Sequence, residues 1–203
     1  MPRRAPFNPS GYYHVSTRGN FGEPLFRSPG EHELYLELFQ RYAQKFGWTT
    51  LAWTLIWNHH HFLIKLSDDG LSEGMRRINH GFSRRINAAY DRTGKGHLVR
   101  HSFFAAEIES DEYLLGALRY IDLNAVEAKL CERPEDWQWC GYAATMGFRK
   151  PRAFHDTAAT LRLLGRRPED ARRSYAGFVL NPLPGKGYDF APPAPAPVIR
   201  SAS

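Results

Sequence analysis

The chain has 203 residues, of which 42% are hydrophobic and 24% are charged, and its formal net charge is +6. This composition is that of one folded domain with appendages, and the sequence has no run of about 18 apolar residues that could span a membrane. The 2 cysteines, Cys131 and Cys140, are separated by 8 residues, which excludes a CxxC motif and a secreted disulfide framework. We therefore expect a protein of the reducing cytoplasm.

The first half of the chain mixes strand and helix patterns. A strand is expected over residues 12–17, and apolar spacing predicts an amphipathic helix over residues 31–46 that ends at Gly47. Two further strands are expected over residues 48–57 and 59–66. Their connection is so short that they must pair in antiparallel fashion.

The second half continues without the regular alternation of a doubly wound fold. It predicts a helix over 71–90, an extended stretch over 97–108, a capped helix over 110–126, and short helices over 157–164 and 168–180. We expect an α+β fold of the ferredoxin-like kind, an antiparallel sheet flanked by helices.

Composition divides the chain into three parts. Residues 1–147 are expected to form the main domain and residues 148–190 a helical extension. Residues 191–203 follow as a Pro/Ala-rich tail that we expect to be disordered.

Three consecutive histidines stand in the strand expected over residues 59–66. Because side chains alternate between the faces of a strand, His59 and His61 share one face and His60 lies on the other. Two imidazoles about 7 Å apart along a strand can share a divalent metal ion. The alternative is a solvated strand face on which the histidines only form hydrogen bonds.

The helix expected over residues 110–126 places Tyr113, Ala117, Tyr120 and Asn124 on one face. The amide oxygen of Asn124 is a suitable hard ligand for Mg²⁺ or Mn²⁺ beside two histidines. Tyr120 lies one turn earlier and could act as a nucleophile if it were activated, because the pKa of a free tyrosine is near 10. Tyrosines on helices are also common core or rim residues, so the spacing suggests this site without identifying it.

Positive charge is concentrated between residues 71 and 102, where 7 lysines and arginines accompany 2 acidic residues. Four of these arginines fall outside the apolar stripe of the predicted helix: Arg76, Arg77, Arg84 and Arg85. A concentrated basic surface is typical of contact with a polyanion. A solvated helix face would leave the same pattern, and charge alone leaves both interpretations open.

An ordered set of motifs over roughly residues 11–145 resembles the single-tyrosine HUH transposases of insertion sequences, and more closely the REP-associated tyrosine transposases. The motifs are YHVSTRGN at 13–20, NHHHFLI at 58–64, GHL at 96–98, DEYLL at 111–115, RYIDLN at 119–124 and ERPEDWQW at 132–139.

The resemblance implies a site and its chemistry. His59, His61 and Asn124 would bind a divalent metal ion, Mg²⁺ or Mn²⁺, and Tyr120 would be the nucleophile. Single-stranded or hairpin DNA would be cut through a 5′-phosphotyrosine bond and rejoined without a high-energy cofactor. The four arginines of the basic helix would hold phosphates, and a homodimer is implied, in which Tyr120 serves its own or the partner's site.

Several positions depart from the family pattern. His60 stands where relatives have an apolar residue, and Trp57 stands where they usually have proline. Asp122 and Ala125 replace a usual histidine and proline, and a basic pair is missing near residues 102–104. Two alternatives therefore stay beside the transposase: a DNA-binding protein of the same fold that has lost strand transfer, and a metal-dependent hydrolase of small phosphoesters.

Overall fold

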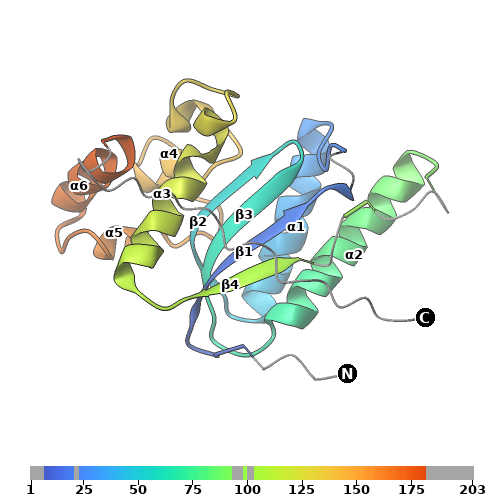
Figure 1. Ribbon diagram of the computed structural model, residues 1–203, viewed down its shortest axis with the longest axis horizontal. Helices are drawn as coiled ribbons and strands as arrows, with labels where there is room; N and C mark the ends of the chain where they lie inside the picture. Colours follow the sequence, from blue (N-terminus) through green and yellow to red (C-terminus); the bar gives the residue numbers. More distant parts are fainter. Residues whose placement is uncertain (1–6, 21–22, 93–97, 100–102, 182–203) are drawn as a thin grey trace.

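The computed structural model describes residues 7–20, 23–92, 98–99 and 103–181 (Figure 1). Its first elements are β1 (Tyr12–Arg18), α1 (Pro29–Lys45), β2 (Thr49–Ile56), β3 (His59–Lys65), α2 (Leu71–Ala89), β4 (Phe104–Ile108) and α3 (Asp111–Glu127). The chain continues with the 3₁₀ helix η2 (Pro134–Asp136), α4 (Tyr142–Thr145), α5 (Thr157–Arg162) and α6 (Pro168–Leu180). The predicted elements are present within a few residues of their expected ends, whereas the short η2 and α4 were not predicted.

The four strands form one antiparallel sheet in the order β2-β3-β1-β4. With its β-α-β-β-α-β element order, this arrangement confirms the predicted ferredoxin-like α+β fold. In the central pair, Ser16 of β1 lies opposite His61 of β3, and Arg18 lies opposite His59. Of the expected extended stretch over 97–108, residues 97 and 100–102 lie outside the described residues, and β4 is its regular part.

Helices cover both faces of the sheet (Figure 1). α1 and α2 pack on one face, where Tyr13, Val15 and Phe62 belong to a core rich in aromatic rings. α3 packs on the other face together with α5 and α6, and there Leu63 and Ile121 belong to a second core. The alternation of side chains along β1 and β3 therefore decides which of the two helical layers each residue meets.

Local sequence explains where α1 and α3 begin. Ser28 accepts a hydrogen bond from the backbone N–H of Glu31, and Pro29 follows at the first helical position of α1. Ser110 caps α3 in the same way by accepting from Tyr113 N. Because α3 begins at Asp111, residues 120 and 124 reach the sheet near β3.

The C-terminal extension shares the second core. Leu161, Ala171, Tyr175 and Val179 are buried there against α3. Arg119 of α3 also donates from Nε to the carbonyl of Val179, at 3.0 Å. The predicted division at residue 147 stays a prediction, and the tail over 191–203 lies outside the described residues.

The outer edge of β2 is occupied by later parts of the chain. Leu55 donates to the carbonyl of Trp139 at 2.9 Å, and Gly141 donates to that of Trp53 at 2.9 Å. Further along the strand, Asp156 donates to the carbonyl of Thr50 at 3.0 Å. The hydrogen-bonding groups along this edge are thus partly satisfied within the chain. Within the described residues, no helix is long and apolar enough to cross a membrane.

Candidate active site

The three histidines of β3 divide between the faces of the sheet as alternation predicts. His61 faces α3, where the centroid of its ring lies 5.2 Å from that of Tyr120. The ring centroid of His59 lies 4.8 Å from that of His61 on the same side. His60 faces α1 and α2, and its Nε2 lies 2.6 Å from the hydroxyl of Tyr35.

His14 of β1 is a site residue to which sequence reasoning gave no role. Its Nε2 lies 2.8 Å from Nδ1 of His61, and its ring centroid is 6.0 Å from that of Tyr120. Burial lowers the pKa of His14 to about 4. Alternation along β1 could have placed His14 on one face with Ser16, but the sequence does not reveal that β1 pairs with β3.

The ring nitrogens of His59 and His61 are suited to a metal ion. Nδ1 of His59 lies 2.7 Å from Oδ1 of Asn58, which holds this nitrogen as a donor and leaves Nε2 with its lone pair. Burial lowers the pKa of His59 to about 4 and that of His61 well below its usual value, so both rings are neutral as metal ligands require.

Asn124 is the predicted third ligand. Its Oδ1 and Nε2 of His61 are both buried, and neither has a hydrogen-bond partner in the part of the chain that the structure describes. The side chain of Asn124 also comes close enough to His59 and Tyr120 to raise the pKa of the first and lower that of the second. Within the described residues, no three His, Cys, Asp or Glu side chains form a metal-binding group. A neutral amide oxygen as third ligand fits this donor set.

Tyr120 is half-buried beside these ligands. Burial raises its pKa, and the charge of Glu127 adds to that effect. Arg18 and Asn124 act in the opposite direction. The free phenol is therefore protonated at neutral pH, and a nucleophilic role requires additional positive charge in the site.

The other residues of the predicted face have structural positions. Ala117 is fully buried in the second core, and Tyr113 packs at the edge of that core. The candidate site therefore contains Tyr120 and Asn124 but not the whole helical stripe.

The family described as "Transposase IS200 like" matches residues 9–124. This range covers more than half of the chain and includes every residue of the site described above. The chain belongs to this family. A comparison with curated proteins gave no match.

The fold of this IS200-like transposase family member is similar to that of a REP-associated tyrosine transposase solved bound to a REP hairpin. The TM-score is 0.59, with 16% sequence identity over 76% of this chain and 88% of that chain. At this identity the likeness concerns the fold, and it agrees with the resemblance found in the motifs.

His60, which stands where the resembled family has an apolar residue, has a hydrogen-bond partner on the other face of the sheet. Tyr35 donates from its hydroxyl to Oδ1 of Asn79 at 2.8 Å, and the same hydroxyl meets His60. Asn79 in turn donates to the hydroxyl of Thr17 at 3.1 Å. His60 is therefore held on the α1–α2 side of the sheet, away from the predicted ligands His59 and His61.

Asp122, the other unusual polar residue, is also buried away from the site. Tyr175 of α6 donates a hydrogen bond to its carboxyl group, and Cys140 lies beside it. Burial raises the pKa of Asp122 to about 7. The residue ties α3 to the C-terminal extension instead of facing Tyr120.

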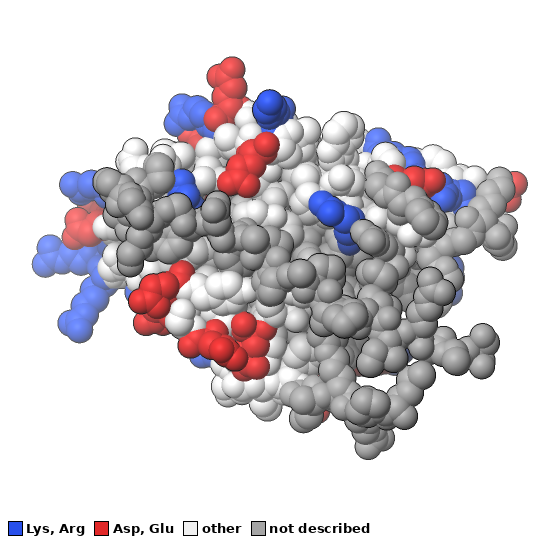
Figure 2. Space-filling model, in the orientation of Figure 1, with Lys and Arg blue, Asp and Glu red and all other residues white. Residues whose placement is uncertain are grey.

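The four predicted DNA-binding arginines lie on α2, outside its buried stripe. Arg76 and Arg77 share the carboxylate of Glu73 at 2.8 and 2.5 Å, while Arg84 and Arg85 are exposed and form no ion pair with the described residues. Figure 2 shows basic side chains at the ends of the molecule where α2 and α6 lie, and acidic ones beside the start of α3. Because α2 covers the other face of the sheet, these arginines do not converge on Tyr120, and their contact with DNA stays a prediction. Lys95, His97, Arg100 and His101 lie outside the described residues.

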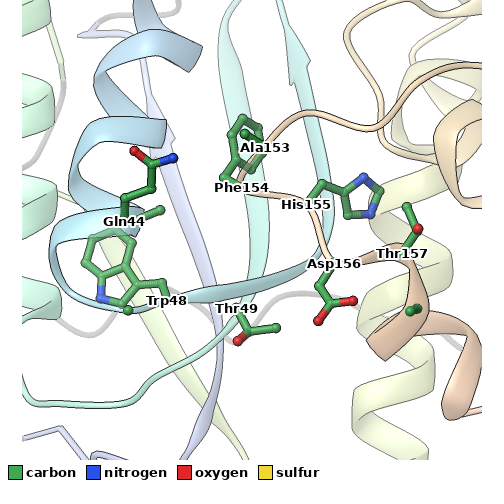
Figure 3. A pocket seen from close by; sticks show the side chains of 11 residues that line it. Gln44, Trp48, Thr49, Ala153, Phe154, His155, Asp156 and Thr157 are labelled. Atoms are coloured by element: carbon green, nitrogen blue, oxygen red, sulfur yellow. The ribbon is translucent and has the colours of Figure 1, made fainter.

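A cavity of about 500 Å³ lies at the opposite end of the strands (Figure 3). Gln44, Trp48, Thr49 and His155 are among the residues that line it. Thr49 pairs with Lys65, whereas His59 pairs with Ile56 at the far end of the same two strands. No residue of the candidate site lines this cavity.

Proposed function

We propose that this IS200-like transposase family member cuts and rejoins single-stranded DNA through Tyr120, acting on DNA that contains a hairpin. The observation that carries the proposal is the ring of Tyr120 lying 5.2 Å from that of His61, beside two buried polar atoms, Nε2 of His61 and Oδ1 of Asn124, that have no hydrogen-bond partner among the described residues. The relative of similar fold was solved bound to a REP hairpin, which supports a hairpin as the partner.

His59, His61 and Asn124 are the residues that would hold a divalent ion, Mg²⁺ or Mn²⁺. Such an ion, when bound, withdraws negative charge from the phosphate oxygens and lowers the barrier to attack at phosphorus. Asn58 and His14 orient the two rings through their hydrogen bonds with Nδ1. The two buried neutral histidines and the amide oxygen would supply the metal ligands, and the nearby phenol would supply the nucleophile for a phosphodiester.

The proposed reaction has two steps, cleavage and rejoining. The phenol oxygen of Tyr120 loses its proton and attacks phosphorus, the bond from phosphorus to the 3′ oxygen breaks, and that oxygen leaves with the electron pair and gains a proton. A 5′-phosphotyrosine bond keeps the energy of the cut linkage. A second 3′-hydroxyl then attacks this bond, which restores the DNA linkage and frees Tyr120.

Tyr120 stands over the histidines of its own chain, which supports cleavage within one subunit. The homodimer implied by the resemblance stays a prediction. Mixing a Tyr120→Phe subunit with a His61→Ala subunit tests the arrangement, because cleavage restored by mixing would require the tyrosine of one subunit to serve the metal site of the other.

The direct test uses end-labelled single-stranded hairpin DNA with Mn²⁺, separated on a denaturing protein gel beside Tyr120→Phe. We expect a metal-dependent band of DNA linked to protein that is absent for Tyr120→Phe. Equal cleavage by both proteins without such a band would indicate attack by water and a hydrolase. Binding of hairpins without cleavage or adduct would indicate a DNA-binding protein that has lost strand transfer.

A further inference from the structure

Arg18, the last residue of β1, lies on the same face of the sheet as the candidate site. Thr17 accepts a hydrogen bond from Asn79 on the α2 side, so alternation places Arg18 on the opposite side with Ser16 and His14. The Cα partner of Arg18 in the neighbouring strand is His59. This side chain therefore begins next to a predicted metal ligand.

The charge of Arg18 acts on the site, and no carboxylate of the described residues pairs with it. It lowers the pKa values of His59, His61 and Tyr120, which shows how close it lies to all three. Arg18 is exposed, and no acidic side chain of the described residues pairs with it. An exposed guanidinium without a carboxylate partner among the described residues, beside the proposed DNA-cleaving site, is suited to bind an anion.

Trp57 lies on the other side of His59 along the chain. Its side chain is 58% exposed, so much of the indole ring is accessible to solvent. It occupies the turn between β2 and β3, next to Asn58, whose side chain holds the ring of His59. An exposed indole therefore lies within two residues of the site.

The backbone around both residues is fixed. The carbonyl of Trp57 accepts hydrogen bonds from Leu25 N at 2.6 Å and Phe26 N at 2.8 Å. Gly19, next to Arg18, donates to the carbonyl of Asn58 at 2.8 Å. A Cβ on Gly19 would approach the carbonyl oxygen of Glu23 to 2.2 Å, so glycine is required for this close packing. The end of β1 and the β2–β3 turn thus form one rigid corner of the molecule.

We propose that Arg18 and Trp57 form a nucleotide subsite beside His59, in which the guanidinium binds a backbone phosphate of single-stranded DNA and the indole stacks on an unpaired base. Planar guanidinium groups bind phosphate through paired hydrogen bonds, and exposed aromatic rings stack on bases of any sequence. The subsite rests on the proposed function for its substrate, and it gives that substrate a fixed position relative to Tyr120.

The test measures binding of a fluorescent DNA hairpin with a single-stranded extension, by anisotropy, with all proteins carrying Tyr120→Phe so that no cleavage occurs. Trp57→Ala should weaken binding roughly 5- to 100-fold. Arg18→Gln should reduce the slope of log K against log salt by about 0.7, the value for one lost phosphate contact on a single strand. Phe148→Ala and Arg41→Gln are matched controls, an exposed aromatic residue and an exposed arginine outside this corner.

Two scans along the DNA locate the contacts. Abasic nucleotides should abolish the effect of Trp57→Ala at one position only, and neutral methylphosphonate linkages should abolish the effect of Arg18→Gln at one linkage near it. The subsite would be overturned if the losses of affinity from the protein variant and the DNA change were additive at every position. It would also be overturned if the variants lost no more affinity than the controls. Trp57→Leu and Arg18→Lys repeat the comparison if either first variant has a lowered melting temperature.

The outcome is separable from that of the proposed function. If each variant loses its effect at one DNA position but the wild-type protein forms no covalent adduct, the subsite is supported and the protein binds DNA without cutting it. If the wild-type protein forms the adduct but neither variant shows a position-specific loss of its effect, the subsite is rejected and the proposed function is kept.

Discussion

His60 and His61 are neighbours in β3, and both are almost completely buried, with exposures of 0% and 4%. On the α1–α2 side, Nε2 of His60 meets the hydroxyl of Tyr35, which in turn donates to Asn79. On the α3 side, Nε2 of His61 and Oδ1 of Asn124 meet no hydrogen-bond partner among the residues that the structure describes. A buried polar group without a partner costs about 1–3 kcal/mol of stability. Nδ1 of His60 also has no partner among the described residues, so the two faces differ at Nε2. This atom is bound within the fold on the α1–α2 side, whereas on the α3 side it lies near Tyr120, where we propose that a metal ion binds.

The largest expected effect comes from removing the predicted metal ligands on the α3 side. His61→Ala should lower the rate of DNA cleavage about 100-fold or more, because metal affinity depends on the ligands and their hydrogen-bonded partners. His60→Leu is the matched control on the opposite face and should retain most of the activity. Single-turnover cleavage with excess protein and Mn²⁺ measures both. Equal losses in the two variants would contradict the division between the faces.

Binding of Mn²⁺ should stabilise the folded protein through the same side. At a free concentration about 100 times the dissociation constant, the free energy of unfolding should rise by about 2.7 kcal/mol. Thermal unfolding with Mn²⁺ and with EDTA measures the difference. The stabilisation should persist in His60→Leu and disappear in His59→Ala with His61→Ala. Its persistence in the double variant would place the ion elsewhere.

Tyr35→Phe breaks the network on the α1–α2 side. It leaves Nε2 of His60 and Oδ1 of Asn79 buried without the hydroxyl, so the free energy of unfolding should fall by about 1–3 kcal/mol. Denaturant unfolding measures this loss, and Tyr12→Phe serves as a control at a partly exposed tyrosine. Cleavage by the fraction that remains folded should change little. A specific loss of Mn²⁺ affinity would show that the two faces are coupled.

Asp122 adds a pH-dependent contribution within α3. Its pKa rises from 3.8 to about 7 on folding, so the folded protein holds this proton between the two values. The free energy of unfolding that Asp122 contributes is therefore present below pH 3.8 and falls as the pH rises to about 7. Buried histidines act in the opposite direction, since burial lowers the pKa of His155 to about 4.

The variant Asp122→Asn isolates this contribution. Its stability relative to the wild type should increase by about 1 kcal/mol or more between pH 5 and pH 8. Urea unfolding at several pH values measures the difference, and Asp156→Asn is a control at an exposed carboxylate. A difference that stays constant with pH would show that Asp122 is ionised in the folded protein.

The smallest effect is expected on α2. Arg84→Gln with Arg85→Gln should weaken DNA binding only several-fold and reduce the salt dependence, with about 0.7–0.9 lost from the slope for each phosphate contact removed. Anisotropy titrations at several salt concentrations measure this change. An unchanged slope would make these residues part of a solvated helix face.

The sequence was enough to name four residues that the structure brings together, whereas it gave no role to His14; that the four residues form a metal and nucleophile site stays a prediction. His59, His61, Tyr120 and Asn124 follow from the period of a strand and of a helix, since each pair lies within one element. Their association across elements came from the resemblance. Local periodicity could not reveal that His14 contacts His61, or that Tyr35 meets His60 from 25 residues away, because both contacts depend on how distant elements pack.

The distribution of basic residues was predicted less completely than the residues of the candidate site. The sequence placed the four α2 arginines outside an apolar stripe, but it could not tell which face of the sheet α2 would cover. A second basic stretch was missed: residues 149–173 contain 8 lysines and arginines and 3 acidic residues. Most of these side chains are exposed around α5 and α6, on the side of the sheet that α3 with Tyr120 also covers.

The hydrogen bonds along the outer edge of β2 also bear on how the protein behaves in solution. An uncovered edge strand offers its backbone to a strand of another molecule and promotes aggregation. Residues 139–141 and 156 protect part of this edge from within the chain. A protein cut after residue 147 would keep the first of these contacts and lose the second, while the apolar surface of α3 beneath α6 would become exposed. We therefore expect that removing the C-terminal extension would promote self-association of the protein.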